Sequence, residues 1–359
     1  MRRAATALIL VIAVAGCGVD LYESPDFGAV DVGDDVALWR LARGPEGFVG
    51  IGGPVQPEDL EEGAGPLTFG SYRSTDGRTW QAGETLGAID VPLLGLTAWP
   101  GGYAASGQWD GVAAVMVSED GLAWRRIDLP APGPDAPSIE SAGIAAGDGV
   151  ILVTGFSGEP ATPVIWTVDP AAGPTPADTS AFPTGSRLTQ AAFGPAGFVA
   201  VAVGTTDSST PPPIWVGGDG TDWVPVLDPF DGATVVTGLI GSSGGYVAVV
   251  AEDGSDDRFT VWTSPNGIDW SRRADQDTIF GYLTGKGGGL LADLSGEPGG
   301  EPDPRPIAFT FDGRWLEITE AVGGERFVAV AVAADETIRL VSGFVSGKPA
   351  VPAILIAGG

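Results

Sequence analysis

Short apolar segments recur along most of the chain, and glycine, proline and aspartate turns separate them. The clearest group consists of Thr234–Gly241, Tyr246–Glu252, Phe259–Ser264 and Trp270–Arg273. The second segment is almost continuously apolar, which is typical of a strand buried on both faces. Glycine pairs follow several of the first segments and suit tight hairpins that need positive φ. The pattern therefore predicts an all-β chain built from four-stranded antiparallel units.

One short motif returns along the chain: Asp-Gly, then two residues, then Trp. The copies are Asp76, Gly77 and Trp80; Asp120, Gly121 and Trp124; Asp219, Gly220 and Trp223; Asn266, Gly267 and Trp270; and a shortened Asp312, Gly313 and Trp315. Successive copies are 44, 99, 47 and 46 residues apart, and the double step predicts a degenerate copy near Asp169. A period of this length is typical of β-propeller blades, each a four-stranded antiparallel sheet.

The spacing predicts a seven-bladed propeller over residues 31–359. The first six blades span 36–82, 90–127, 138–170, 187–226, 233–273 and 279–318. The seventh, 325–358, offers only three strands: Arg326–Ala334, Thr337–Ser346 and Val351–Ala357. We expect the N-terminal segment around Phe27–Val32 to supply the missing outer strand, because closure removes exposed sheet edges.

The full motif, Ser-x-Asp-Gly-x-x-Trp, resembles the Asp-box, or BNR repeat, of sialidase-like propellers. The resemblance covers about 320 residues. It implies a hairpin between the third and fourth strands of each blade, in which aspartate accepts hydrogen bonds from turn amides and glycine supplies positive φ. It also implies that tryptophan packs between neighbouring blades. These roles are structural, and the motif also occurs in many non-catalytic propellers.

The N-terminus reads as an export signal over residues 1–16, with Arg2 and Arg3 before a short apolar run. It ends Val14-Ala15-Gly16-Cys17, which resembles the lipobox of bacterial lipoproteins. This resemblance implies acylation of Cys17, a lipidated tether over 17–30, and a location on the outer side of the cytoplasmic membrane or at the cell surface. The alternative is an ordinary signal peptide with an incidental cysteine.

Composition excludes several classes of function. The chain has no histidine, which excludes a Ser-His-Asp hydrolase. It has one cysteine, which excludes a disulfide framework and a zinc site built from paired thiolates. With 46 acidic and 18 basic residues its net charge is −28, so nucleic acid should be repelled. We expect no cofactor, no resident metal and a monomer whose membrane contact is the lipid anchor alone.

Acidic residues concentrate in connections that the blade pattern places on one face. These connections include Pro57–Glu62, Glu252–Asp257 and 297–306. The candidate binding face comprises Trp109, Glu252, Asp253, Asp256 and Asp257, with Phe156 and Phe230 on the same side. Three roles stay open: solvation, a surface for an envelope protein or carbohydrate partner, and calcium ligation by the Glu252–Asp257 loop.

Sialidase-like hydrolysis is the alternative function. The family uses three arginines and a tyrosine–glutamate nucleophile, and only Arg40 in the first blade matches, without the Ile-Pro that normally follows it. Tyr103 and Tyr246 lie in second strands, where core packing is expected. The sequence therefore favours a non-catalytic binding or scaffolding module at the cell envelope.

Overall fold

The structure is a computed structural model of the whole chain. It describes residues 22–23, 28–30, 32, 36–54, 67–89, 95–131, 139–147, 149–203, 214–231, 235–251, 259–272, 284–285, 290–294, 305–309, 315–317, 327–334, 338–345 and 351–358.

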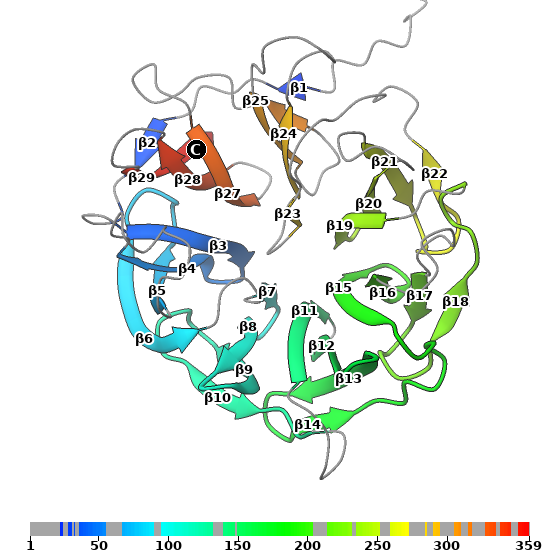
Figure 1. Cartoon of the computed structure of the whole chain (residues 1–359). Coiled ribbons are helices and arrows are strands. Elements are labelled where there is room, and N and C mark those ends of the chain that lie inside the picture. Colours follow the sequence, from blue (N-terminus) through cyan, green and yellow to red (C-terminus); the bar gives the residue numbers. More distant parts are fainter. Residues whose placement is uncertain are drawn as a thin grey trace, which may run out of the picture.

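Four-stranded antiparallel sheets follow one another around a ring (Figure 1). The first two contain β3 (Val36–Gly44), β4 (Gly47–Pro54), β5 (Leu67–Ser74) and β6 (Gln81–Ile89), then β7 (Gly95–Trp99), β8 (Gly102–Trp109), β9 (Val112–Ser118) and β10 (Arg125–Asp128). A single bridge between Ile89 and Trp109 joins these two sheets. The next two contain β11 (Ile139–Gly147), β12 (Val150–Ser157), β13 (Thr162–Asp169) and β14 (Gly173–Pro176), then β15 (Arg187–Gly194), β16 (Gly197–Val203), β17 (Ile214–Gly217) and β18 (Val224–Val226).

The remaining strands complete the ring. They are β19 (Val235–Ser242), β20 (Gly245–Ala251), β21 (Phe259–Ser264) and β22 (Ser271–Arg272); β23 (Thr284–Gly285), β24 (Leu290–Leu294), β25 (Arg305–Phe309) and β26 (Trp315–Glu317); and β27 (Phe327–Ala334), β28 (Ile338–Val345) and β29 (Val351–Gly358). Two N-terminal strands join the last two sheets: β1 (Tyr22–Glu23) pairs parallel with β26, and β2 (Gly28–Val30) pairs antiparallel with β29. Leaving aside the added N-terminal strands β1 and β2, the first strand of each sheet in chain order lies nearest the centre of the ring (Figure 1).

The predicted all-β class is confirmed, because the described residues form strands and turns but no helix. Among these residues no helix is therefore long and apolar enough to cross a membrane. The four strands expected between Thr234 and Arg273 are present to within a residue or two as β19–β22. The three expected between Arg326 and Ala357 are present as β27–β29.

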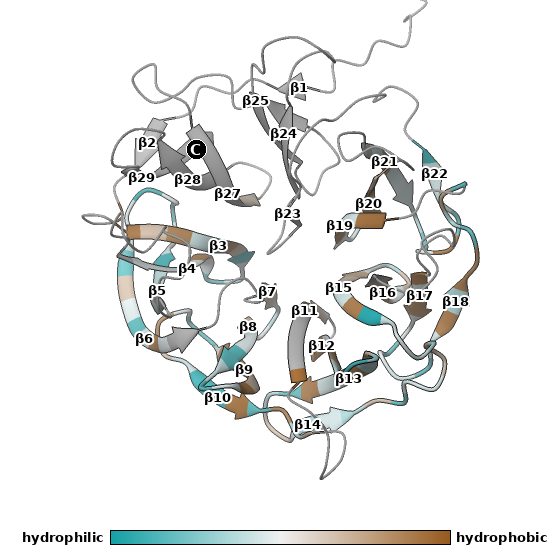
Figure 2. Cartoon of the chain, in the orientation of Figure 1, coloured by the Kyte–Doolittle hydropathy of each residue, from teal (hydrophilic) through white to brown (hydrophobic). Residues whose placement is uncertain are grey.

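The core lies between neighbouring sheets. One cluster joins Val49 and Ile51 of β4 to Leu96 and Tyr103 of the next sheet. Another joins Leu152 of β12 to side chains of the β15–β18 sheet. Apolar residues dominate the middle strands β16, β17 and β20, whereas the outer strand β14 is paler or hydrophilic (Figure 2). The sheets from β3 to β22, whose side-chain burial is described, therefore bury both faces and leave their outer strands largely to solvent.

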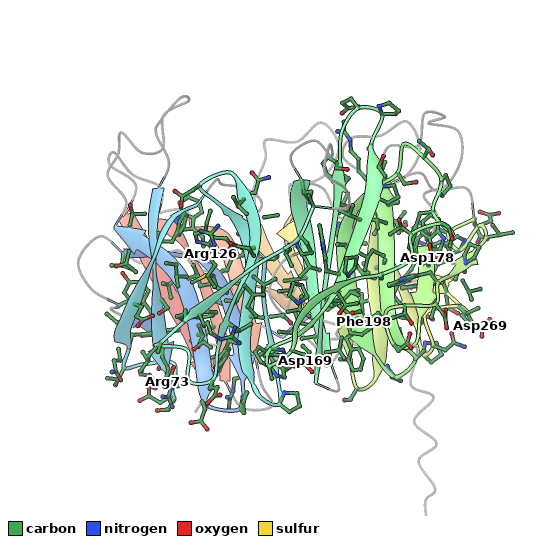
Figure 3. All side chains as sticks on the ribbon, turned by 90° about the horizontal axis from the view of Figure 1, so that it is seen from below. Arg73, Arg126, Asp169, Asp178, Phe198 and Asp269 are labelled. Atoms are coloured by element: carbon green, nitrogen blue, oxygen red, sulfur yellow. The ribbon has the colours of Figure 1, made fainter. Side chains whose placement is uncertain are left out.

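The ring has two faces that differ in their connections. We call hairpin face the end with the first-to-second strand turns and the third-to-fourth strand hairpins, which include 44–47, 75–80, 119–124, 170–172, 194–197, 218–223, 242–245 and 265–270. We call loop face the opposite end, which includes 110–111, 129–131, 158–161, 177–186 and 227–231. In Figure 3, Arg73 and Asp169 lie toward the hairpin face, and Arg126 and Asp178 lie nearer the loop face.

Two buried tyrosines tie neighbouring sheets together at the hairpin face. The hydroxyl of Tyr246 donates to the carbonyl of Gly197 at 2.8 Å and accepts from the amide of Ala196 at 3.2 Å. Tyr103 donates in the same way to Gly47 at 2.9 Å. These tyrosines occupy the second strands, and their hydroxyls are used within the core.

The Tyr246→Phe variant is expected to lose about 1–3 kcal/mol, because it leaves a buried carbonyl and a partly buried amide without the tyrosine hydroxyl as partner. Urea denaturation measures this loss, and Tyr72→Phe is the control. Tyr72 is only partly buried and its hydroxyl makes no hydrogen bond among the described residues, so the loss in Tyr72→Phe should stay within about 0.5 kcal/mol. Equal losses in the two variants would contradict the inter-sheet role of the Tyr246 hydroxyl.

Candidate functional site: the loop face

The repeated motif forms the same turn in each described copy, and all of these turns lie on the hairpin face. Asp76 Oδ1 accepts from the amides of Arg78 and Thr79, both at 2.8 Å. Asn266 Oδ1 accepts from the amides two and three residues later at 3.0 and 2.9 Å. The degenerate copy at Asp169 makes the same pair of bonds, at 2.7 and 3.1 Å. These side chains therefore stabilise hairpin turns, and they lie on the face opposite the loop face.

Glycine and tryptophan complete each full turn. The glycines have φ between 70° and 83°, and the indole Nε1 of the tryptophan donates to the carbonyl of the glycine. Trp223 is 7% exposed, whereas Trp80, Trp124 and Trp270 are partly buried. In the shortened copy, Asp312 and Gly313 lie outside the described residues, and only the backbone of Trp315 is placed.

The turn hydrogen bonds lower the pKa values of the aspartates that accept them. At Asp120 the backbone amides of Ala123 and Leu122 are the main cause, and at Asp219 the bonds from Thr221 are. A lowered pKa means that the turn stabilises the charged form. The resulting stability is fully present above the unfolded pKa, about 3.9, and is lost as the pH falls through the folded pKa.

The Asp120→Asn variant is therefore expected to lose less stability than the parent between pH 5 and pH 2.5, because asparagine accepts the same bonds without titrating, as Asn266 does. The midpoint of urea-induced unfolding, measured at several pH values across this range, shows the effect. Asp222→Asn is the matched control, since it removes an exposed hairpin carboxylate and leaves Asp219 as the acceptor. Parallel pH curves for Asp120→Asn and the parent would refute this account.

Two connections on the loop face are fixed by buried phenylalanines. Phe182 lies 4.6 Å from the Trp215 ring and 5.7 Å from the Trp223 ring. Phe230 makes edge contacts with Trp262 at 5.5 Å and Trp270 at 5.3 Å. In each pair, one tryptophan comes from a third strand and the other from a hairpin of the same sheet.

The sequence analysis did not single out Phe182. It placed Phe230 on the face of the acidic connections, where residues 227–231 do lie, but the Phe230 side chain is only 1% exposed. The signal that could have found both is the pair Trp215 and Trp262, each in a third strand just before a hairpin, where a large ring invites an aromatic partner from the preceding connection. Phe182 and Phe230 therefore make these connections part of the rigid scaffold.

Exposed carboxylates surround these anchors on the loop face. Asp178, Asp228 and Asp231 belong to the anchored connections, and Asp228 and Asp231 have φ of 46° and 51°. Leu227, between β18 and Asp228, is 84% exposed. A rigid connection thus presents an apolar side chain beside negative charge.

Two arginines lie within the same face, and each contacts local acids. Arg126 pairs with Asp128 at 2.5 Å and Asp110 at 3.7 Å, and it donates to the carbonyl of Trp109 at 3.3 Å. Arg187 pairs with Glu159, and its guanidinium carbon lies 5.1 Å from the centroid of the Phe156 ring. Both cations are therefore engaged by neighbouring residues, and the described connections of the loop face carry acidic but no basic side chains.

Trp109 does not offer a stacking surface. Its side chain is 3% exposed and belongs to the core cluster between the first two sheets. The expectation that it forms part of an exposed binding face is wrong, because the Ile89–Trp109 bridge draws the residue into the sheet junction. The other candidate residues, Glu252, Asp253, Asp256 and Asp257, lie outside the described residues.

Arg40 is nearly buried on the innermost strand β3. Its guanidinium donates to the carbonyl of Trp39 at 2.6 Å, and burial lowers its pKa to about 10. It follows a bulge in β3 that shifts the register between Leu38 and Arg40. Arg40 is 8% exposed and thus is not presented to solvent as a substrate clamp would be. Within the described part of the chain, no three acidic or thiol side chains come close enough to hold a metal ion.

No family model matches the sequence, and no curated protein does. Solved structures match by fold. Streptogramin B lyase is 11% identical with a TM-score of 0.52, covering 93% of this chain and 97% of its own. The β-propeller domain of the trilobed protease from Pyrococcus furiosus is 11% identical at 0.51, covering 90% and 96%. YCF48 bound to D1 peptide is 12% identical at 0.50, covering 94% and 99%. These similarities show a β-propeller fold.

Proposed function

We propose that this chain is an exported, lipid-anchored β-propeller that acts as a non-catalytic binding or scaffolding module at the cell envelope. The anchor is the acylated Cys17, and the repeated turns are Asp-boxes of a seven-bladed ring. The pairing of β2 with β29 supports closure by the N-terminal segment. The hydrogen-bonded turns around Asp76, Asp120, Asp219 and Asn266 support the Asp-box assignment.

The loop face carries the binding role. The observation that supports it most is the rigid acidic connection of Leu227 to Asp231, fixed by Phe230 between two tryptophans. Rigid loops lose little conformational entropy on binding, and carboxylates attract a cationic partner. Propellers of this architecture include a lyase, a protease domain and a protein bound to a peptide, so the fold alone decides none of these functions.

Two measurements test the proposal. Growth with an alkyne-bearing fatty acid should label the parent chain and fail to label Cys17→Ser. Titration of a lysine-rich peptide into the soluble Cys17→Ser chain should show binding that weakens as salt rises.

A paired comparison locates that binding. Asp228→Asn with Asp231→Asn should weaken the peptide several-fold, because asparagine keeps the left-handed backbone and removes the charge. The control pair, Asp222→Asn with Asp269→Asn, removes the same charge from the hairpin face and should leave the affinity nearly unchanged. Equal losses of peptide affinity in both pairs would mean that the loop-face carboxylates serve only to solvate the protein.

A further inference from the structure

The N-terminal strands fix where the chain leaves the ring. Within each full sheet the fourth strand runs from the hairpin face to the loop face, since it begins at the third-to-fourth hairpin. β26 is such a strand and begins at Trp315. β1 pairs with it in parallel, with Tyr22 opposite Trp315 and Glu23 opposite Leu316. β1 therefore begins at its hairpin-face end and runs toward the loop face.

The second N-terminal strand gives the same direction independently. β29 is a third strand in its sheet and runs toward the hairpin face, because its last residues pair with the beginning of β28 at Ile338. β2 is antiparallel to it, with Gly28 opposite Ile356 and Val30 opposite Ile354. β2 thus also begins at its hairpin-face end and runs toward the loop face.

From these two registers we infer that the hairpin face is turned toward the membrane and the loop face away from it. The inference rests on the proposed acylation of Cys17. Five residue steps separate Cys17 from Tyr22, so a fully extended chain spans at most roughly 18 Å. Strands of eight residues make the ring about 25 Å deep, which exceeds this reach. A lipid on Cys17 therefore holds the hairpin face nearer the bilayer.

Charge on the hairpin face sets the kind of membrane contact. Asp76, Asp169 and Asp219 are exposed there, and turn hydrogen bonds lower their pKa values, so they are ionised at neutral pH. An anionic bilayer repels such a face within about a Debye length, roughly 8–10 Å. The ring is consequently tethered beside the membrane, and the acidic connections around Leu227 are presented outward to a partner.

Energy transfer to labelled vesicles tests the orientation. The thiol of Cys17, the single cysteine of the chain, is coupled to a maleimide lipid in neutral phosphatidylcholine vesicles that carry a rhodamine-labelled headgroup lipid. A donor dye is clicked onto an azide-bearing phenylalanine placed at Asp222 or at Ala181. Both sites are exposed and flank the β15–β18 sheet, with Asp222 on the hairpin face and Ala181 on the loop face.

Transfer should be about twofold more efficient from Asp222 than from Ala181, because the two labels differ by roughly the depth of the ring. A second pair, Ala123 on the hairpin face and Val112 on the loop face, guards against a label that perturbs folding at one site. A flexible glycine–serine insertion between Cys17 and Tyr22 should erase the difference. Equal transfer in both pairs, or stronger transfer from the loop face, would overturn the inference.

This outcome is separable from that of the proposed function. Chemical coupling replaces acylation, so the orientation is measured whether or not cells acylate Cys17. Absence of fatty-acid labelling in the parent chain would refute the anchor, whereas equal transfer would refute the orientation and leave the anchor standing.

Discussion

The Trp223→Ala variant is expected to lose about 3–5 kcal/mol of stability, because truncation opens a cavity between two sheets. Trp223 is 7% exposed and packs in a cluster with Leu152 and Ile165 of the preceding sheet. Its indole also contacts Phe182 and donates to Gly220 at 3.2 Å. Truncation therefore releases the loop-face anchor as well as the hairpin. Reversible denaturation in urea, with the slope checked for two-state behaviour, measures the loss.

Trp124→Ala is the matched comparison. Trp124 holds the same place in its turn and makes the same bond to Gly121, but its side chain is only partly buried at the edge of its cluster. We expect about 1–2 kcal/mol there, since less apolar surface leaves contact. If Trp223→Ala costs less than about 1 kcal/mol, the placement of this ring between sheets is wrong.

Gly121→Ala is expected to cost about 2–4 kcal/mol through two additive causes. Gly121 has φ of 77°, where a side chain strains the backbone. A Cβ there would also lie 2.2 Å from Cγ2 of Val49 in the neighbouring sheet, too close for either atom to remain in place. The turn glycine thus sets how closely two sheets approach.

A glycine in open space separates the two causes. Gly149 has φ of 84°, and no described atom lies within 4 Å of the position its Cβ would take. Gly149→Ala should cost only the backbone strain, about 1–2 kcal/mol. Combining Gly121→Ala with Val49→Ala should recover part of the loss, as a double-mutant cycle would show. Equal losses of stability in Gly121→Ala and Gly149→Ala would show that the clash with Val49 contributes nothing.

Local pattern was enough for much of the fold. The strands between Thr234 and Arg273 could be placed to within a residue or two, because alternating turns and apolar runs are local signals. The hidden repeat at Asp169 could be found from spacing alone, and its turn makes the same two hydrogen bonds as the others. Such turns close within four residues, so their hydrogen bonds can be predicted from the sequence.

The loop face was less predictable, since its geometry depends on contacts between sheets. Trp109 and Phe230 are aromatic residues beside polar loops, which suggests exposure, yet both are buried. Trp109 is drawn in by its bridge to Ile89, and Phe230 by two rings about 32 and 40 residues further along the chain. No local pattern specifies which aromatic side chain meets a partner so distant in sequence.

The sequence by itself determined the class of the fold, the repeat, the turn chemistry at Asp76, Asp120, Asp219 and Asn266, and the excess of negative charge. Only the tertiary structure decided which side chains the loop face exposes and in which direction the N-terminal strands β1 and β2 run. Turns and strands follow from neighbouring residues, whereas burial and strand direction at the closing sheets depend on pairings such as Tyr22 with Trp315, which the chain makes only once it is folded.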